Sequence, residues 1–122
     1  MKFNILIFIL ILASLGFSSC DKTCNTTRSI RILTEHKWRI DSYIDYSINQ
    51  EMYISPELYE FGKDGSVTKI RNNDTIRGEW SIPECSYLKI NSMTFKVAEM
   101  SRKMMVLRYG EVDFVYRSDD GN

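Results

Sequence analysis

Histidine occurs once in this chain of 122 residues, proline twice and cysteine three times. The lone histidine, His36, and the few cysteines do not provide the converging nitrogen and sulfur ligands of most metal sites. The sequence also lacks a glycine-rich phosphate loop and a serine-centred nucleophile elbow. We therefore expect no catalytic residue, no metal and no cofactor, and interpret the protein as a non-enzyme in which His36 is exposed or ends a helix.

An excess of charge of either sign is also missing. Sixteen Lys and Arg residues balance sixteen Asp and Glu residues. A nucleic-acid partner would call for a basic stripe, so we expect none. One short stretch is richer in basic residues, and it either faces anionic lipid or forms a solvated surface. Its members are Lys22, Arg28, Arg31, Lys37 and Arg39.

The long apolar run of the chain lies at its start, in residues 5–13. It is shorter than the roughly 20 apolar residues that span a bilayer. Lys2 precedes it, and the small residues Ser18 and Ser19 lead into Cys20, which is the layout of a secretory signal. A cysteine at that place resembles the lipobox of bacterial lipoproteins. The alternative is an ordinary secreted protein in which Cys20 is incidental.

The lipobox resemblance implies cleavage before Cys20 and acylation of that residue. A diacylglycerol would be attached to the Cys20 sulfur, and a further chain such as palmitate to the new amine. Two or more acyl chains anchor a protein stably to a membrane. We therefore expect a lipid-anchored protein of the bacterial cell envelope, with the choice between inner and outer membrane left open.

The other two cysteines, Cys24 and Cys85, lie far apart in the sequence. Outside the cytoplasm they either form a disulfide or remain separate thiols. A disulfide would close a long loop, which is worth about 4 kcal/mol in the chain-entropy model. It would also attach the segment after Cys20 to the domain that follows.

The rest of the chain alternates apolar and polar residues with a period of two, which is typical of half-buried strands. Residues 38, 40, 42, 44 and 46 predict one inward face. A helix precedes them, capped by Thr26 or Thr27. Pro56 is expected to end a short strand at residues 52–54.

About eight such strands follow one another, with turn signals every eight to twelve residues. Asp64-Gly65 is the clearest hairpin turn because both residues tolerate a positive φ. This spacing predicts an all-β fold, an antiparallel up-and-down meander that closes into a barrel. We expect a signal peptide at 1–19, a tether at 20–27, one barrel domain at 28–118 and a polar tail at 119–122.

Four motifs in this order resemble the lipocalin-like domains of small bacterial lipoproteins, and they cover most of residues 33–117. They are residues 33–38 (LTEHKW), 58–67 (LYEFGKDGSV), 78–82 (GEWSI) with 88–90, and 95–97 with 105–107. The resemblance implies a lipocalin-like barrel with a short N-terminal helix. It implies no particular activity, because that group shares none.

The large side chains of the predicted inward faces have two interpretations. They either line a calyx for a small apolar ligand or simply fill the barrel. They are Trp38, Ile40, Tyr59, Phe61, Trp80, Phe95, Leu107, Phe114 and Tyr116. Ser42 and Gly78 are the small inward residues that a calyx would require. Glu57 and Glu60, three apart, are expected on opposite faces of a strand as solvated charges.

Two function hypotheses follow from this interpretation. In the first, the protein is a binding module that holds a small apolar molecule at the envelope. In the second, it is an interaction or scaffold module that contacts another envelope protein through exposed tyrosines, because tyrosine is favoured at interfaces. The tyrosines in question are Tyr43, Tyr46, Tyr53 and Tyr109.

Overall fold

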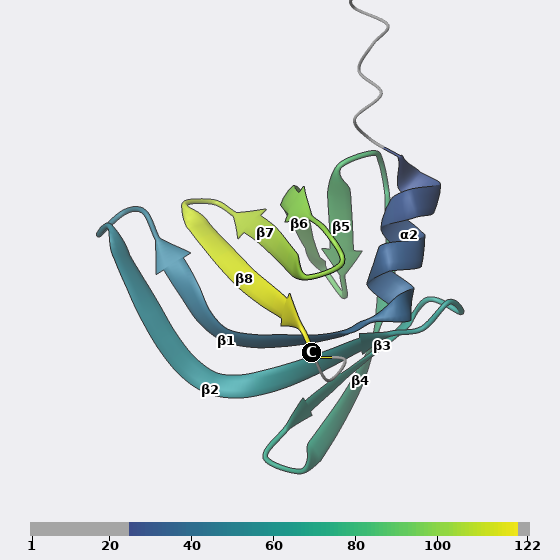
Figure 1. Ribbon diagram of the computed structural model, residues 1–122, viewed down its shortest axis with the longest axis horizontal. Helices are drawn as coiled ribbons and strands as arrows, with labels where there is room; N and C mark the ends of the chain where they lie inside the picture. Colours follow the sequence, from purple (N-terminus) through teal and green to yellow (C-terminus); the bar gives the residue numbers. More distant parts are fainter. Residues whose placement is uncertain (1–24, 120–122) are drawn as a thin grey trace, which may run out of the picture.

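The computed structural model of the protein describes residues 25–119. One α-helix precedes eight β-strands (Figure 1). The helix α2 spans Thr26–Glu35, and the strands are β1 (Lys37–Asp45), β2 (Gln50–Phe61), β3 (Ser66–Arg71), β4 (Asp74–Ser81), β5 (Tyr87–Ile90), β6 (Met93–Met100), β7 (Met104–Tyr109) and β8 (Val112–Ser118). The predicted signal peptide, Cys20, Cys24 and residues 120–122 lie outside the described residues.

The eight strands form a closed antiparallel barrel in sequence order. Each strand pairs with the next, and β8 returns to pair with β1. The predicted fold class, an all-β up-and-down barrel of about eight strands with a short N-terminal helix, is confirmed. Closure gives each strand two neighbours, with which it pairs over part or all of its length.

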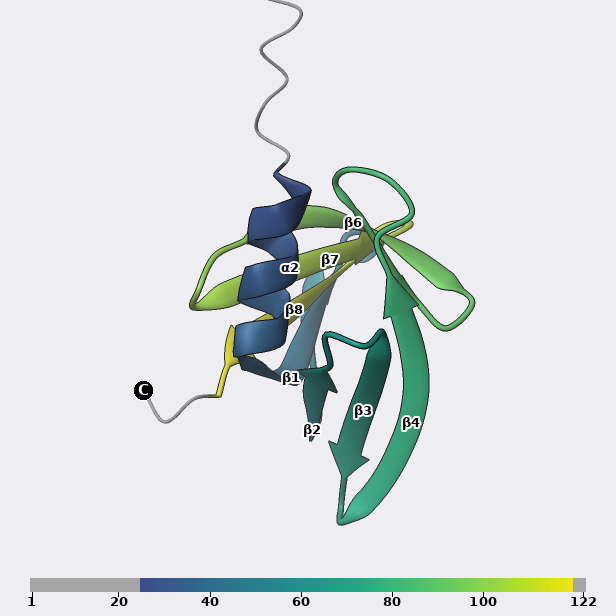
Figure 2. The same ribbon diagram turned by 90° about the vertical axis from the view of Figure 1, so that its right-hand side faces the viewer.

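Helix α2 lies against one end of the barrel (Figures 1 and 2). Its N-cap is Asn25, whose side-chain oxygen accepts a hydrogen bond from the Arg28 amide at 3.0 Å, so the predicted Thr26 or Thr27 cap is wrong. Ile32 and Leu33 are buried in the barrel core. The helix therefore closes this end of the barrel with apolar side chains.

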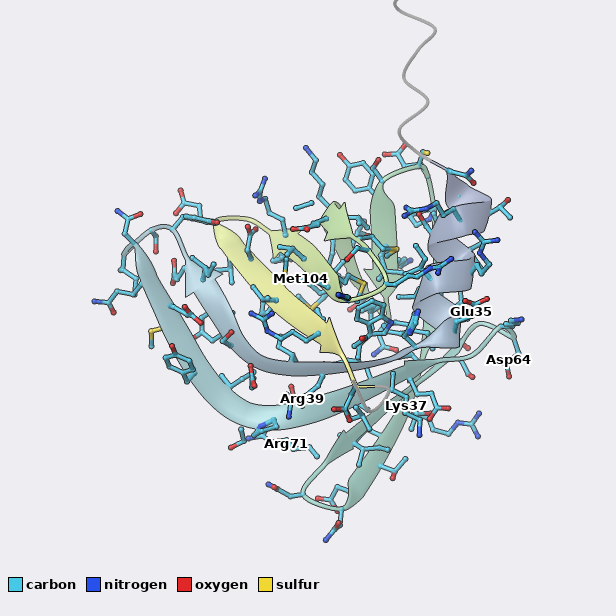
Figure 3. All side chains as sticks on the ribbon, viewed as in Figure 1. Glu35, Lys37, Arg39, Asp64, Arg71 and Met104 are labelled. Carbon is cyan, nitrogen blue, oxygen red and sulfur yellow. The ribbon has the colours of Figure 1, made fainter. Side chains whose placement is uncertain are left out.

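The predicted basic stretch is spread over two elements. Lys22 lies outside the described residues, Arg28 and Arg31 lie on α2, and Lys37 and Arg39 belong to β1, which begins after the other end of the helix (Figure 3). The helix has ten residues and is therefore about 15 Å long. That length separates Arg28 from the two basic residues of β1.

A β-bulge divides β1 into two halves, and the inward and outward positions alternate in opposite order in the two halves. Against β8, Ile40 and Ser42 pair with the adjacent residues Tyr116 and Val115, so Asp41 is an extra residue on β1. Against β2 the extra residues lie on β2 itself, because Ile40 pairs with Glu57 and Ser42 with Tyr53. One extra residue moves every later side chain to the other face of the sheet. Ser42 pairs with Val115 on the outer face, and Tyr43 takes the inward position. The predicted inward run is therefore wrong beyond Ile40, and Ser42 is not an inward residue.

The bulge also explains why Pro56 does not end a strand, as the sequence had predicted. β2 runs without a break from Gln50 to Phe61 (Figure 1). Its register against β1 jumps from Tyr53 to Glu57, so Pro56 lies in the irregular part of the pairing. Proline has no amide hydrogen to donate and is tolerated at such places.

The barrel interior is densely filled near α2. Trp38, Phe61, Leu88 and Met105 are each at most 2% exposed, and Leu33 of the helix packs with them. The Trp38 Nε1 hydrogen donates to the Leu33 carbonyl at 3.1 Å, which fixes the indole below the helix. A domain of this size builds one main core, and here that core lies at the helical end.

On the outer face, a charged cluster ties the β1–β2 hairpin to β7 and β8. Arg108 donates two hydrogen bonds to the Asp113 carboxylate, at 2.8 and 3.1 Å. The Tyr46 hydroxyl donates a third at 3.1 Å. The hydrogen bonds from Arg108, followed by the one from Tyr46, hold the pKa of Asp113 below its ordinary value. Asp113 is buried and remains ionised because its oxygens are fully engaged.

Candidate functional site

The candidate site is a cavity of about 320 Å³ within the barrel, away from α2. Residues of β2, β3, β4, β5, β6 and β8 line it. Its walls are apolar, formed by Val67, Ile76, Ile90 and Met93. The interior is therefore filled at the helical end and hollow further along the same strands.

The cavity exists because most of β4 is not paired with β5. Only Trp80 and Ser81 of β4 pair with β5, so the earlier half of β4 pairs with β3 alone. The β3–β4 hairpin consequently projects from the body of the barrel (Figures 1 and 2). Ile76 is 54% exposed and Met93 is 40% exposed, although both line the cavity. These two side chains mark its entrance.

Three aromatic side chains, Tyr59, Phe95 and Tyr116, form the inner wall of the cavity. The rings of Tyr59 and Tyr116 meet edge to face with centroids 5.4 Å apart, and their hydroxyls are hydrogen-bonded. Burial raises the pKa of Tyr116 well above its ordinary value, and the neighbouring Tyr59 and Glu57 raise it further. Burial, followed by Glu57, also raises the pKa of Tyr59. Both phenols are therefore neutral hydrogen-bonding groups at physiological pH.

Polar residues line the rest of the cavity, namely Lys69, Asn91, Ser92 and Arg77, the last on the opposite face of β4 from Ile76. The Lys69 Nζ atom lies 3.6 Å from the Glu57 carboxylate. Because Glu57 pairs with Ile40 across β1 and β2, it faces inward, and its side chain is only 13% exposed. The prediction that Glu57 is a solvated charge is therefore wrong.

Arg71, on the same face of β3 as Lys69, lies 3.9 Å from that carboxylate at the projecting end of the strand (Figure 3). Glu60 pairs with Lys37 on the other face of β2, exposed and opposite to Glu57 as predicted. The carboxylate pair considered from the sequence is therefore not formed, and the partners of Glu57 are two cations.

The nine side chains predicted to fill or line the barrel fall into three groups. Tyr59, Phe95 and Tyr116 line the cavity. Trp80 and Phe114 are partly buried and pack against the core. The remaining four, Trp38, Ile40, Phe61 and Leu107, are buried in the core and do not line the cavity.

Sequence reasoning missed the walls and the charged lining of the cavity. Gly78 was predicted to face inward and lines the cavity, whereas Ile76, which alternates with Gly78 and Trp80 on β4, had the same signal and was not assigned to the lining. Lys69 had a similar signal, because it lies two residues after the buried Val67 on β3. A charged residue whose position in the alternation predicts an inward side chain is easily assigned to the solvent-exposed surface when the barrel is assumed to be filled.

Gly78 sits where β4 passes close to the turn before β6. A Cβ atom at Gly78 would overlap the Asn91 side chain, whose oxygen accepts a hydrogen bond from the Glu79 amide at 3.1 Å. We expect Gly78→Ala to displace Asn91, to break that bond and to lower the free energy of unfolding by about 1–2 kcal/mol. Urea denaturation monitored by circular dichroism measures the change.

A double-mutant cycle provides the control for Gly78→Ala. Asn91 has a positive φ of 55°, so Asn91→Gly removes the obstructing side chain without straining the backbone. In the Asn91→Gly background, Gly78→Ala should cost clearly less than it does alone. Equal costs in both backgrounds would mean that overlap with Asn91 is not the cause.

A second cavity, of about 290 Å³, lies between α2 and strands β5 and β6. Close to it, the Thr26 hydroxyl donates to the Cys85 sulfur at 3.9 Å, which places Cys85 beside the start of the helix. Cys85 is disulfide-bonded. Its predicted partner, Cys24, lies outside the described residues, so the identity of the pair stays a prediction.

Among residues 25–119, no helix is long and apolar enough to cross a membrane. In this part of the chain, no three His, Cys, Asp or Glu side chains come together as a metal site would require. His36 lies directly after α2, with its ring 5.8 Å from that of Trp38 in an edge-to-face contact.

Comparison with known proteins supports the fold. No protein-family model and no curated protein matches the chain. Two solved structures do match, each with a TM-score of 0.59 and each covered over 97% of its length. One is a lipocalin-like protein from Bacteroides uniformis, which is 20% identical and covers 70% of this chain. The other is an uncharacterized protein from Bacteroides eggerthii, which is 19% identical and covers 68%. The chain therefore has a lipocalin-like barrel fold.

Proposed function

We propose that this protein is a lipid-anchored, non-catalytic binding protein of the bacterial cell envelope, whose barrel holds a small, largely apolar ligand. The observation that carries the proposal is the cavity beside Tyr59, Phe95 and Tyr116. Apolar walls with a few polar groups at fixed positions are the usual composition of small-molecule sites.

The size of the cavity limits the ligand. At about 320 Å³ it lies at the lower end of the range for ligand pockets, roughly 300–1,000 Å³. It has room for about ten water molecules at their liquid volume. A single short chain or one ring system fits, whereas a long polyene or a sterol does not.

The membrane part of the proposal rests on the sequence alone. Cys20 follows a signal-like segment, and acyl chains on that residue would hold the protein at the membrane. Only five residues separate Cys20 from the start of α2 at Thr26. A linker this short would keep the barrel close to the bilayer and give it access to molecules that leave the lipid phase.

Native mass spectrometry of the protein purified from its own membrane tests this proposal. We expect the mass of acyl groups on Cys20 and a co-purifying small molecule. We also expect Ile76→Trp to lose that molecule, because the larger side chain blocks the entrance. Ile48→Trp is the matched control, since Ile48 is 53% exposed against 54% for Ile76 and does not line the cavity. Absence of a bound molecule from the parent protein, together with no uptake of lipophilic dyes, would contradict ligand binding.

The second candidate function is an interaction module of the envelope. Exposed apolar side chains on the β1–β2 hairpin favour it, with Tyr53 79%, Ile48 53% and Tyr46 48% exposed. Tyr43, which was expected among them, instead faces inward with its ring 5.9 Å from that of Phe114. Cross-linking in intact cells followed by affinity purification would favour this candidate if Tyr53→Ala abolished capture of one defined partner.

A further inference from the structure

The charge in the ligand cavity is of one sign. Among the described residues of its lining, Lys69 is the charged residue on the inward face, and no Asp or Glu residue takes part. Arg77 also belongs to the lining, but it pairs with Thr68 on the opposite face of β4 from Ile76. The molecule as a whole has no such bias, because basic and acidic residues are equal in number. The asymmetry is therefore a property of this site.

Lys69 is available to a ligand. Its Nζ atom is 3.6 Å from Glu57, which exceeds the 2.7–3.2 Å typical of an N–H···O hydrogen bond, so the contact is electrostatic only. An ammonium group has three hydrogens to donate, and the side chain is 32% exposed. Arg71 shares the same carboxylate at 3.9 Å. One carboxylate thus lies near two cations, so the net charge next to the cavity is positive.

The groups beside Lys69 suit an anionic headgroup. Tyr59 pairs directly with Lys69 across β2 and β3, so their side chains share the inward face. The hydroxyls of Tyr59 and Tyr116 are neutral and hydrogen-bonded to each other, so one of their two hydrogens is left to donate to a ligand. Further along the cavity, the apolar walls formed by Val67, Ile90 and Phe95 suit a hydrocarbon body.

From this arrangement we infer that the cavity selects an amphipathic carboxylate, with its anionic head beside Lys69 and its hydrocarbon body against Val67, Ile90 and Phe95. This inference rests on the proposed binding function. It adds a chemical class to it, because a carboxylate can accept charge-assisted hydrogen bonds from the Lys69 ammonium and a purely apolar ligand cannot.

A matched pair of probes tests the inference. Decanoate and decanol have the same chain length and differ in the charge of the headgroup. Their affinities for the mature chain are measured by isothermal titration calorimetry, with Cys20→Ser in place to remove the acyl groups and leave every described residue unchanged. We expect decanoate to bind about tenfold more tightly than decanol, as one charge-assisted hydrogen bond contributes.

Variants then locate the selectivity. Lys69→Met should remove the preference for decanoate, and Lys69→Arg should keep most of it. Lys63→Met is the matched control, because Lys63 is exposed and does not line the cavity. If Lys69→Met loses the circular dichroism spectrum of the folded barrel, Lys69→Gln replaces it and should weaken decanoate binding without affecting decanol.

The outcomes distinguish failure of the inference about the ligand class from failure of the proposed binding function. Equal binding of decanoate and decanol would overturn the anionic class and leave the binding function in place. Binding of neither probe would count against the binding function itself. A preference for decanoate that persists in Lys69→Met, or in Lys69→Gln where that variant replaces it, would show that the head lies elsewhere, which also overturns the inference.

Discussion

Replacing Trp38 with alanine is expected to lower the free energy of unfolding by about 3–5 kcal/mol. Trp38 is the second residue of β1, and its side chain is completely buried, at 0% exposure, against the last turn of α2. Its removal would leave a void among Leu33, Phe61 and Met105, and the Leu33 carbonyl would lose its hydrogen bond. Domains of this size have a total stability of about 5–15 kcal/mol, so the variant should lie near the limit of folding.

Two further variants divide this cost into its parts. Trp38→Phe keeps most of the volume and removes the Nε1 hydrogen, so it should cost about 1–3 kcal/mol. Tyr53→Ala, at a side chain that is 79% exposed, should stay within about 0.5 kcal/mol of the parent. Urea denaturation followed by circular dichroism gives all three values. A loss below about 1 kcal/mol for Trp38→Ala would mean that the helix and the barrel do not depend on this contact.

The part of the fold that the sequence predicts well is the part decided locally. Asp64-Gly65 takes the turn expected of it, with Gly65 at a φ of 88°. Asn72 and Asn73 also turn at positive φ, between β3 and β4. Such turns depend on one or two residues, and period-two alternation between them predicts which segments are strands.

Features decided by several strands together were predicted poorly. Asp41 looks like any other polar residue of an alternating strand, yet the pairing of β1 with β8 makes it a bulge. That single residue moves Ser42 to the outer face and Tyr43 to the inner one. Pro56 appears to end a strand, although the irregular pairing next to the bulge accommodates it. Registers between strands are not visible in the order of residues along one strand.

The candidate site was predicted in part for the same reason. Alternation identifies Tyr59, Phe95 and Tyr116 as inward residues, but it does not separate them from Trp38 and Phe61, which fill the core. The difference arises from α2, which covers one end of the barrel, and from the early parting of β4 from β5. Both are tertiary arrangements, and they decide which inward side chains meet a void.

The buried tyrosines should make the protein sensitive to alkaline pH. The folded state raises the pKa of Tyr116 well above the ordinary value of 10.0, so the folded protein keeps a proton that the unfolded chain releases. The stability linked to Tyr116 is therefore fully present below pH 10.0 and is lost as the pH rises toward the folded pKa. The expected loss is about 1.4 kcal/mol for each pH unit in that window.

Tyr116→Phe isolates this contribution. At neutral pH the variant should be less stable by about 1 kcal/mol, because the hydrogen bond to Tyr59 is missing. Above pH 10.0 the stability of the parent should fall more steeply, so that the two curves converge. Free energies of unfolding from urea titrations at a series of pH values measure both slopes. Tyr53→Phe should leave the slope of the parent unchanged, because Tyr53 is 79% exposed. Parallel curves for Tyr116→Phe and the parent would show that this phenol ionises as readily in the barrel as in the unfolded chain, and the inner wall of the cavity would then be open to water.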